Sequence, residues 1–182
     1  MSGGLDFPPR FHSPRVTRIT DSVTEDRQDP VMCIMCDEGA TLDEVRFNIH
    51  GIIDRYGWFI QYVEAFPTSH AWAYTIGLTA GFDHPELVVT GVTPQAAARI
   101  LNRLGEMIRS GRSFGVGGNH FVPSIGQLCF SEVHPAHYDR GVLATWIDYY
   151  DCLGMRPSAT AIEVLLPGRE AQLATSSSSF GH

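Results

Sequence analysis

The chain has 182 residues, of which 43% are hydrophobic and 18% charged, a balance typical of a folded domain and too apolar for a disordered chain. Its formal net charge is -7 and its 13 basic residues, all arginine, form no basic run, so neither nucleic acid nor an anionic membrane is an expected partner. No stretch reaches the roughly 18 apolar residues of a membrane helix, and the first residues lack the order of a secretory signal, so we expect a cytoplasmic protein.

The composition changes twice along the chain. Residues 1–31 contain four prolines and mixed charges without an apolar period, which is typical of an extended arm. Residues 168–182 contain a serine run that cannot build a core, which predicts a flexible tail. Residues 32–167 are therefore expected to form a single globular domain, which is large enough to bury a core.

The folded region opens with a predicted helix over residues 41–57. Thr41 and Glu44 have capping-box spacing, apolar residues recur at helical intervals, and Gly57 supplies a stop signal. Three short segments rich in aromatic and branched residues follow, separated by glycine and proline turn signals. These predicted strands are residues 58–63, 72–78 and 86–92.

The second half of the domain adds two helices and two strands. Thr93 and Pro94 open the next helix, and a glycine-rich loop without a phosphate-loop lysine follows it, so no nucleotide is expected to bind there. Three consecutive strands with short turns favour antiparallel pairing, and the helices must cover the sheet. We predict an α+β fold in the order αβββαβαβ, with a single mostly antiparallel sheet covered by about three helices. The later elements are the helix 93–111, the strand 126–133, the helix 141–154 and the strand 160–167.

Two cysteines with zinc-knuckle spacing precede the first predicted helix. Cys33 and Cys36 are three apart, so both thiolates can reach one ion without strain in the turn. The best candidates to complete the site are His134 and His137, which follow a predicted strand and stand on either side of Pro135, a residue expected to block a regular helix. If folding brings the four ligands together, they form a closed Cys₂His₂ zinc site, which suits a structural role better than a hydrolytic one.

Two other interpretations of these residues stay open. Short cysteine pairs occur by chance, and histidines ahead of a helix often cap it or pack in the core. Alternatively, Cys36 lies near a helix N-terminus, which favours the thiolate of a redox pair. A redox pair is expected after a strand of a βαβ unit, however, and no convincing strand precedes Cys33.

A second group of candidates lies in the middle of the chain. His84 could act as a base beside Glu86, because both side chains have acid–base chemistry, although an exposed loop histidine usually has no chemical role. Alternation along the strand places Tyr74 in the core. Cys129, in a predicted strand, and Cys152, in an apolar helix, are expected to be small buried residues and not nucleophiles.

Five short segments form a combined pattern, and they are Cys33-x-x-Cys36-Asp37, Gly57-Trp58, YTIGL, HPELVV and VHPAH. In this order they resemble a bacterial domain-of-unknown-function family, DUF4262, over about residues 33–167. The resemblance supplies no reaction and no catalytic residue. It implies that the cysteine and histidine pairs belong to one family pattern and that the residues ahead of Cys33 are an extension.

We therefore expect a small bacterial protein of unknown activity that binds zinc in a structural site. One alternative is a metal-free protein-interaction module, in which Trp58, Trp72 and Trp146 contribute to a docking surface. Another is a metal-dependent hydrolase that uses His84, His134 or His137 around an open metal position, with Glu86 as the general base. The expected partner is a protein or a small molecule.

Overall fold

The computed structural model describes residues 41–67, 69–139, 142–155 and 160–167. The predicted arm at 1–31 and the predicted tail at 168–182 lie outside these residues. The helices are α1 (Leu42–Tyr56), α2 (Leu78–Phe82), α3 (Pro94–Arg109), α4 (Pro135–Asp139) and α5 (Ala144–Cys152). The strands are β1 (Phe59–Val63), β2 (Trp72–Ile76), β3 (Glu86–Thr90), β4 (Asn119–Val122), β5 (Gly126–Glu132) and β6 (Ala161–Leu165). Within the described ranges, none of the helices has the length and apolar character needed to cross a bilayer.

The six strands form one sheet in the order β1-β2-β3-β6-β5-β4. Neighbouring strands are antiparallel except β3 and β6, which run in parallel with Glu86 opposite Ala161 and Val88 opposite Glu163. The sheet is therefore mixed, with one parallel pairing at its centre. The predicted α+β fold with a mostly antiparallel sheet is confirmed.

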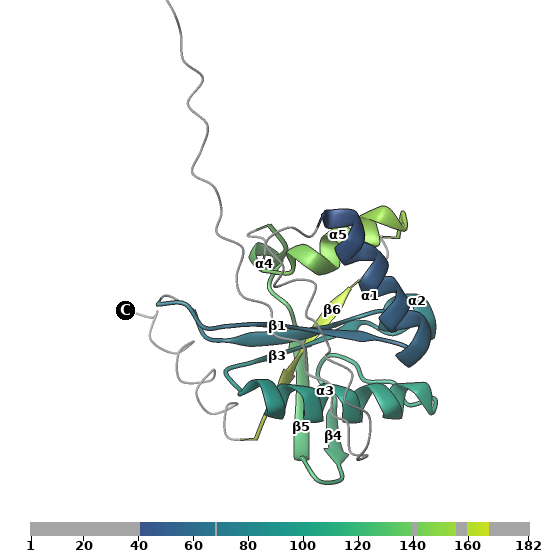
Figure 1. Ribbon diagram of the computed structural model, residues 1–182. Coiled ribbons are helices and arrows are strands. Elements are labelled where there is room, and N and C mark those ends of the chain that lie inside the picture. The colour runs from purple at the N-terminus through teal and green to yellow at the C-terminus, as the bar shows by residue number, and fades with distance from the viewer. Residues whose placement is uncertain (1–40, 68, 140–141, 156–159, 168–182) are drawn as a thin grey trace, which may run out of the picture.

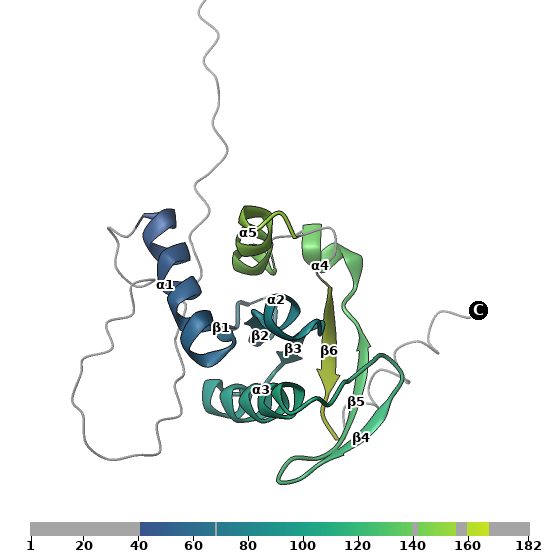
Figure 2. The same ribbon diagram turned by 90° about the vertical axis from the view of Figure 1, so that its right-hand side faces the viewer.

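Helices cover both faces of the sheet (Figure 1). In both views, α1, α4 and α5 lie on one face and α3 lies on the other (Figures 1 and 2). Because side chains alternate along a strand, the sheet supplies apolar residues to two separate layers. Ile53 and Trp146 pack in the layer under α1 and α5, and Leu101 and Leu104 pack in the layer under α3.

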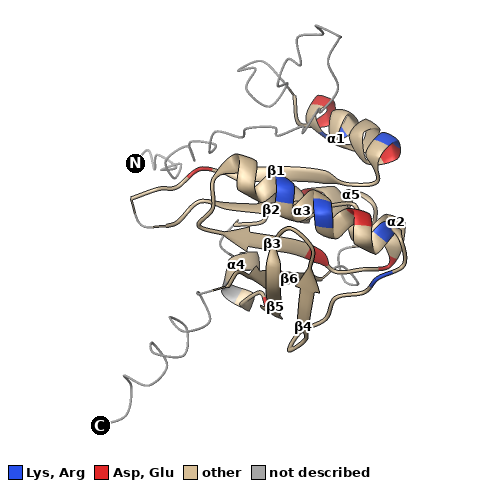
Figure 3. Cartoon of the chain, turned by 90° about the horizontal axis from the view of Figure 1, so that it is seen from below, with Lys and Arg blue, Asp and Glu red and all other residues tan. Residues whose placement is uncertain are grey.

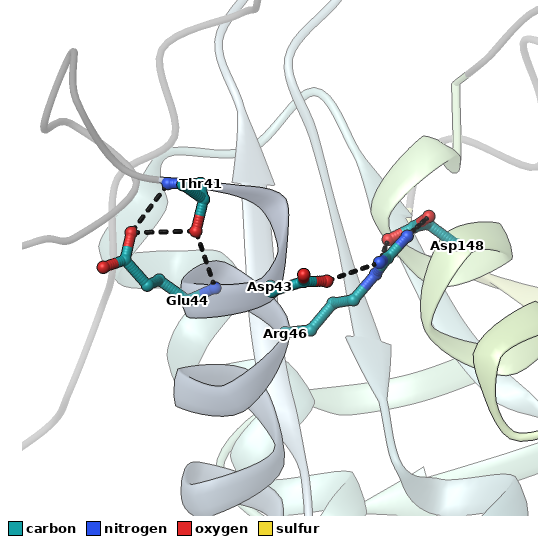
Figure 4. Close-up of polar contacts among 5 residues, drawn as sticks. All are labelled: Thr41, Asp43, Glu44, Arg46 and Asp148. Atoms are coloured by element: carbon teal, nitrogen blue, oxygen red, sulfur yellow. Dashed lines mark hydrogen bonds and ion pairs between the residues drawn. The ribbon is translucent and has the colours of Figure 1, made fainter.

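The first helix begins and ends where the sequence predicts. The Thr41 hydroxyl accepts a hydrogen bond from the Glu44 amide at 3.3 Å, and the Glu44 carboxylate accepts one from the Thr41 amide at 2.8 Å (Figure 4). This reciprocal capping box satisfies two amides that the helix leaves without partners. Gly57, at φ 92°, ends the helix and donates its N–H to the Ile53 carbonyl at 2.7 Å. Glycine adopts this left-handed conformation without strain.

The third helix packs closely on the start of β1. The Thr93 hydroxyl accepts a hydrogen bond from the amide of Ala96 at 3.3 Å, and Pro94 occupies the first turn, as expected for a helix start. Gly105 faces the ring of Trp58 so closely that a Cβ at this position would lie 2.6 Å from two ring carbons. The absence of a side chain at Gly105 is therefore what allows the indole to pack on the helix.

Three short elements go beyond the predicted order αβββαβαβ. The strand predicted to reach residue 78 ends at Ile76, because Gly77, at φ 118°, turns the chain into α2. The short strand β4 lies in the glycine-rich loop and pairs with β5. The prediction that Pro135 blocks a regular helix is wrong, since α4 begins at this residue. Proline is tolerated in the first turn because an amide there has no partner within the helix.

Candidate functional site

The two histidines of the predicted zinc site lie side by side at the junction of β5 and α4. The His137 amide donates a hydrogen bond to the His134 carbonyl at 2.9 Å, which closes the turn that begins the helix. The two ring centroids are 6.2 Å apart, and the rings are nearly perpendicular, at 82°. Both residues are exposed. Folding therefore presents two adjacent imidazoles at the surface, on the face of the sheet that carries α1 and α5 (Figure 1).

The two cysteines of the predicted site, Cys33 and Cys36, lie outside the described residues. Within the described ranges, no group of three or more histidine, cysteine, aspartate or glutamate side chains is placed to hold a metal ion. The first described residue is Thr41, five positions after Cys36 and at the start of α1. The histidine half of the site is thus brought together, and the approach of the thiols to it stays a prediction.

The middle candidate His84 is buried, with 3% of its surface exposed, and is not the exposed loop residue that its position predicts. Its Nδ1 lies 2.7 Å from the Pro85 carbonyl oxygen, and its Nε2 lies 3.0 Å from the Phe114 amide nitrogen. These partners assign a neutral ring that donates from Nδ1 and accepts at Nε2. Burial lowers the pKa of His84, which also favours the neutral form. The imidazole therefore links the start of β3 to the segment that follows α3.

The neighbouring candidate Glu86 lies at the start of β3 and is 1% exposed. One carboxylate oxygen, Oε2, accepts a hydrogen bond from the Thr75 hydroxyl at 2.6 Å. The other, Oε1, accepts from the amides of Gly77 at 2.9 Å and Thr79 at 3.0 Å and from the hydroxyl of Tyr150 at 2.5 Å. A single carboxyl group thus joins β2, the start of α2, β3 and α5 in the interior.

The environment of Glu86 has opposing effects on its charge. Burial raises the pKa of the Glu86 carboxyl group, whereas the four donated hydrogen bonds favour the carboxylate and act against this shift. Burial, together with the nearby Glu86 carboxylate, raises the pKa of the Tyr150 hydroxyl, which therefore keeps its proton and donates it. Both carboxyl oxygens are occupied by protein donors. This arrangement favours a structural role for Glu86 over one in acid–base chemistry.

The sequence does not reveal the hydroxyl partners of Glu86. Thr75 and Tyr150 reach it from β2 and α5, and 64 residues separate Tyr150 from Glu86 in the chain. The sequence does show that Glu86 is a polar residue among the apolar residues of β3, but this pattern does not identify the residues that bind its carboxyl group.

The predicted core position of Tyr74 agrees with its 2% exposure, and burial raises the pKa of this phenol to about 12.

Two further expectations about side chains are wrong. Cys129 is only half-buried and Cys152 is exposed, because Cys152 is the last residue of α5 and lies beyond the residues that pack on the sheet. Trp58 and Trp146 are buried in the two core layers, so they are not available for a docking surface. Trp72 is half-buried, and its indole N–H donates to the Val142 carbonyl at 3.0 Å.

The chain belongs to the family described as Domain of unknown function (DUF4262), which matches residues 52–173 and therefore covers well over half of the chain. The family resemblance of the sequence is thus confirmed. The matched range includes Glu86, His134 and His137, whereas Cys33 and Cys36 precede it. Comparison with curated proteins gives no match, and comparison with solved structures gives none either.

Proposed function

We propose that this DUF4262 protein binds one zinc ion through Cys33, Cys36, His134 and His137. The zinc would connect the segment ahead of α1 to the start of α4, on the face of the sheet that carries α1 and α5. The observation that carries the proposal is the placement of the two histidines, which are adjacent and exposed in one turn of the chain. We place the protein in the bacterial cytoplasm, where thiols stay reduced and available as ligands.

The geometry of the histidine pair is close to that of two ligands on one ion. Zinc binds imidazole nitrogens at about 2.0–2.1 Å in tetrahedral geometry, which holds the centres of two coordinating rings about 5 Å apart. The centres of His134 and His137 are 6.2 Å apart. The observed separation is only about 1 Å larger than this, which supports a site to which each ring contributes one nitrogen.

The cysteine pair is close enough in the chain to complete the coordination. Figure 2 shows α5 between α1 and α4, so the connection must pass over α5 to reach the histidine pair. Cys36 is five residues ahead of Thr41, and an extended run of five residues spans up to about 17 Å. Cys33 is eight residues ahead and reaches up to about 28 Å. The lengths of the side chains add to these distances, and this reach supports an approach of both thiolates to the histidine pair.

A site with these four ligands has no open coordination position for water or substrate. Two thiolates and two imidazoles complete a tetrahedral shell, which is the arrangement of structural zinc sites. Its contribution would be to folding, because the ligands come from segments about 100 residues apart and zinc holds them together. The proposed function is therefore a zinc-stabilised domain, and the hydrolase alternative would require one ligand to be replaced by water.

The test is metal analysis of the full chain purified without an affinity tag. We expect near-equimolar zinc in the unmodified protein and a loss of most of it in Cys33→Ser and in His137→Asn. Cys152→Ser is a matched thiol control, because Cys152 is an exposed cysteine at the end of α5. This control should keep its zinc.

Circular dichroism of each variant separates loss of the metal from loss of the fold. A folded unmodified protein that carries no zinc, and that takes up none when zinc is added under reducing conditions, would refute the proposal. Zinc that stays bound in both Cys33→Ser and His137→Asn would refute this choice of ligands. Extended X-ray absorption of the zinc-loaded protein should show two sulfur and two nitrogen neighbours.

A further inference from the structure

The turn that carries His134 and His137 is too short to hold its shape alone. Helix α4 has five residues, whereas isolated helices shorter than about 12–15 residues are marginal in water. Both histidine side chains are exposed, so they add little to the packing of the turn. The position of the two imidazoles therefore depends on contacts made by other residues of the turn.

Tyr138, the residue after His137, connects α4 to the sheet. Its hydroxyl accepts a hydrogen bond from the Ala161 amide at 3.3 Å and donates one to the Ala161 carbonyl at 3.5 Å. Ala161 is the first residue of β6. Helix α3 and its exposed arginines lie on the opposite face of the sheet and do not take part in this contact (Figure 3).

The Tyr138 hydroxyl reaches β6 where its pairing with β5 has ended. On the β3 side of β6, the Thr160 carbonyl accepts a hydrogen bond from the Glu86 amide at 2.8 Å. The main-chain groups of successive strand residues point to opposite sides, so those of Ala161 face β5. The register of β5 with β6 ends one residue short of Ala161, at Ile162. The hydroxyl, which both donates and accepts, thus serves the main-chain groups that β5 leaves when the chain turns into α4.

The ring of Tyr138 is held by α5. Its centroid lies 5.3 Å from that of Trp146, with the two planes tilted by 53°. Trp146 is 2% exposed and packs on Tyr150 at 5.9 Å. A close-packed interior leaves such a ring little room to move. Tyr138 is therefore held at its hydroxyl by β6 and at its ring by α5.

We propose that Tyr138 is a positioning residue for His134 and His137, an inference that rests on the zinc site proposed above. Tyr138 is not itself a ligand. It holds α4 against β6, so that the two imidazoles are in place before the ion binds. A ligand pair that is already ordered loses less conformational entropy on binding, which raises the affinity for the metal.

The test is competition for zinc between the full chain and a colorimetric chelator under reducing conditions. Tyr138→Phe removes the hydroxyl and keeps the ring on Trp146, so the variant should fold, as checked by circular dichroism. We expect its zinc affinity to fall about 3–10-fold, which corresponds to the net contribution of a hydrogen bond. The visible spectrum of the cobalt(II)-loaded protein should change as well, because it reports the geometry of the ligands.

Tyr150→Phe is the matched control, because it removes a buried hydroxyl from α5 but leaves the contact between α4 and β6 intact. It should lower the stability of the domain more than Tyr138→Phe does, and yet keep the zinc affinity and the cobalt spectrum of the unmodified protein. An unchanged zinc affinity in Tyr138→Phe would overturn the proposal. An equal loss of affinity in the two variants would also overturn it, since the effect would then be one of general stability.

The histidine pair provides a readout that does not depend on zinc. If the unmodified protein binds no zinc, the proposed function fails, and nuclear magnetic resonance of the metal-free chain decides the role of Tyr138. Nuclear Overhauser contacts between the rings of His134 and His137 should then be present in the unmodified protein and weaker in Tyr138→Phe. Equally strong contacts in the two proteins would show that Tyr138 does not position the pair.

Discussion

The hydroxyl of Tyr150 donates a hydrogen bond to Oε1 of Glu86 at 2.5 Å in the interior of the domain. The same hydroxyl accepts a hydrogen bond from the amide of Gly77 at 3.1 Å, and that amide also lies 2.9 Å from Oε1. A phenol, a carboxyl group and a backbone amide thus form a closed group of contacts. This group attaches α5 to the end of β2 and the start of β3.

The first prediction concerns the Tyr150 hydroxyl. Tyr150→Phe removes the donor but keeps the ring, so Glu86 loses one of its four hydrogen bonds in a site that water does not reach. Hydrogen bonds to charged groups contribute about 1.5–3 kcal/mol, and we expect a loss of this size in the free energy of unfolding, measured with urea. Tyr149→Phe is the matched control, since its hydroxyl contacts the exposed His50 at 3.2 Å. Tyr149→Phe should lower the free energy of unfolding by less than about 1 kcal/mol. Equal losses in the two variants would contradict the role of the buried contact.

The second prediction is a pH dependence that comes from Glu86. Burial raises its pKa in the folded state above the ordinary value of 4.5, so the folded protein holds this proton more tightly than the unfolded chain. The associated stability is complete below the unfolded pKa and is lost as the pH rises through the folded pKa. Urea unfolding of the unmodified protein should therefore lose stability above about pH 4.5 relative to Glu86→Gln, which has no proton to release.

The difference in unfolding free energy between the unmodified protein and Glu86→Gln isolates the effect of Glu86 from that of other titrating groups. His84 has a lowered pKa, so its contribution has the opposite sign and is lost as the pH falls below the ordinary histidine value of 6.5. It is present in both proteins and cancels in their difference. If the difference in unfolding free energy between the two proteins increases with pH in favour of the unmodified chain, hydrogen bonding outweighs burial and the carboxyl group has a lowered pKa.

The third prediction concerns the ion pair between α1 and α5. Arg46 contacts Asp148 through two hydrogen bonds, from Nε at 2.8 Å and from Nη2 at 2.6 Å, and also contacts Asp43 at 3.0 Å (Figure 4). The side chains of Arg46 and Asp148 are 32% and 42% exposed, so solvent weakens their attraction. A double-mutant cycle with Arg46→Met and Asp148→Asn should give a coupling of about 0.5–1 kcal/mol. The coupling should fall at 1 M salt.

The neighbouring carboxylate provides the control for this cycle. Asp43 is 90% exposed and lies on the same helix as Arg46, so its coupling to Arg46 should stay below about 0.5 kcal/mol. A coupling between Arg46 and Asp148 no larger than this would show that the two hydrogen bonds between these side chains do not strengthen the ion pair. In that case α1 would be held by its apolar contacts, which come mainly from Ile49 and Ile53.

The parts of the fold that the sequence predicts are those with local causes. The capping box of α1, the threonine and proline that open α3, and the glycine that ends α1 each act within one turn of the chain. The short elements α2, β4 and α4 have four or five residues, too few for an apolar period to appear. Their existence depends on the sheet against which they form, so the sequence could not show them.

In the candidate site too, the features that the sequence predicts have local causes, and the features that it misses depend on distant residues. The spacing of His134 and His137 is local, and the structure places them together in one turn. The contact of Glu86 with Tyr150 depends on the parallel pairing of β3 with β6 and on the position of α5 over them. Such contacts are set by the whole fold. The burial of His84 has the same origin, because Phe114, 30 residues later, covers it.

The last prediction compares two glycines in helices. Alanine usually stabilises a helix by about 1 kcal/mol relative to glycine. At Gly51 of α1, a Cβ would have no atom within 4 Å, so Gly51→Ala should raise the free energy of unfolding by about 0.5–1 kcal/mol. At Gly105 of α3, a Cβ would lie 2.6 Å from the indole ring of Trp58. That ring is fixed by a hydrogen bond to Asn102 at 3.0 Å, so Gly105→Ala should lower the free energy of unfolding by about 1–3 kcal/mol. Stabilisation by both substitutions would show that the indole can move away from α3 at little cost.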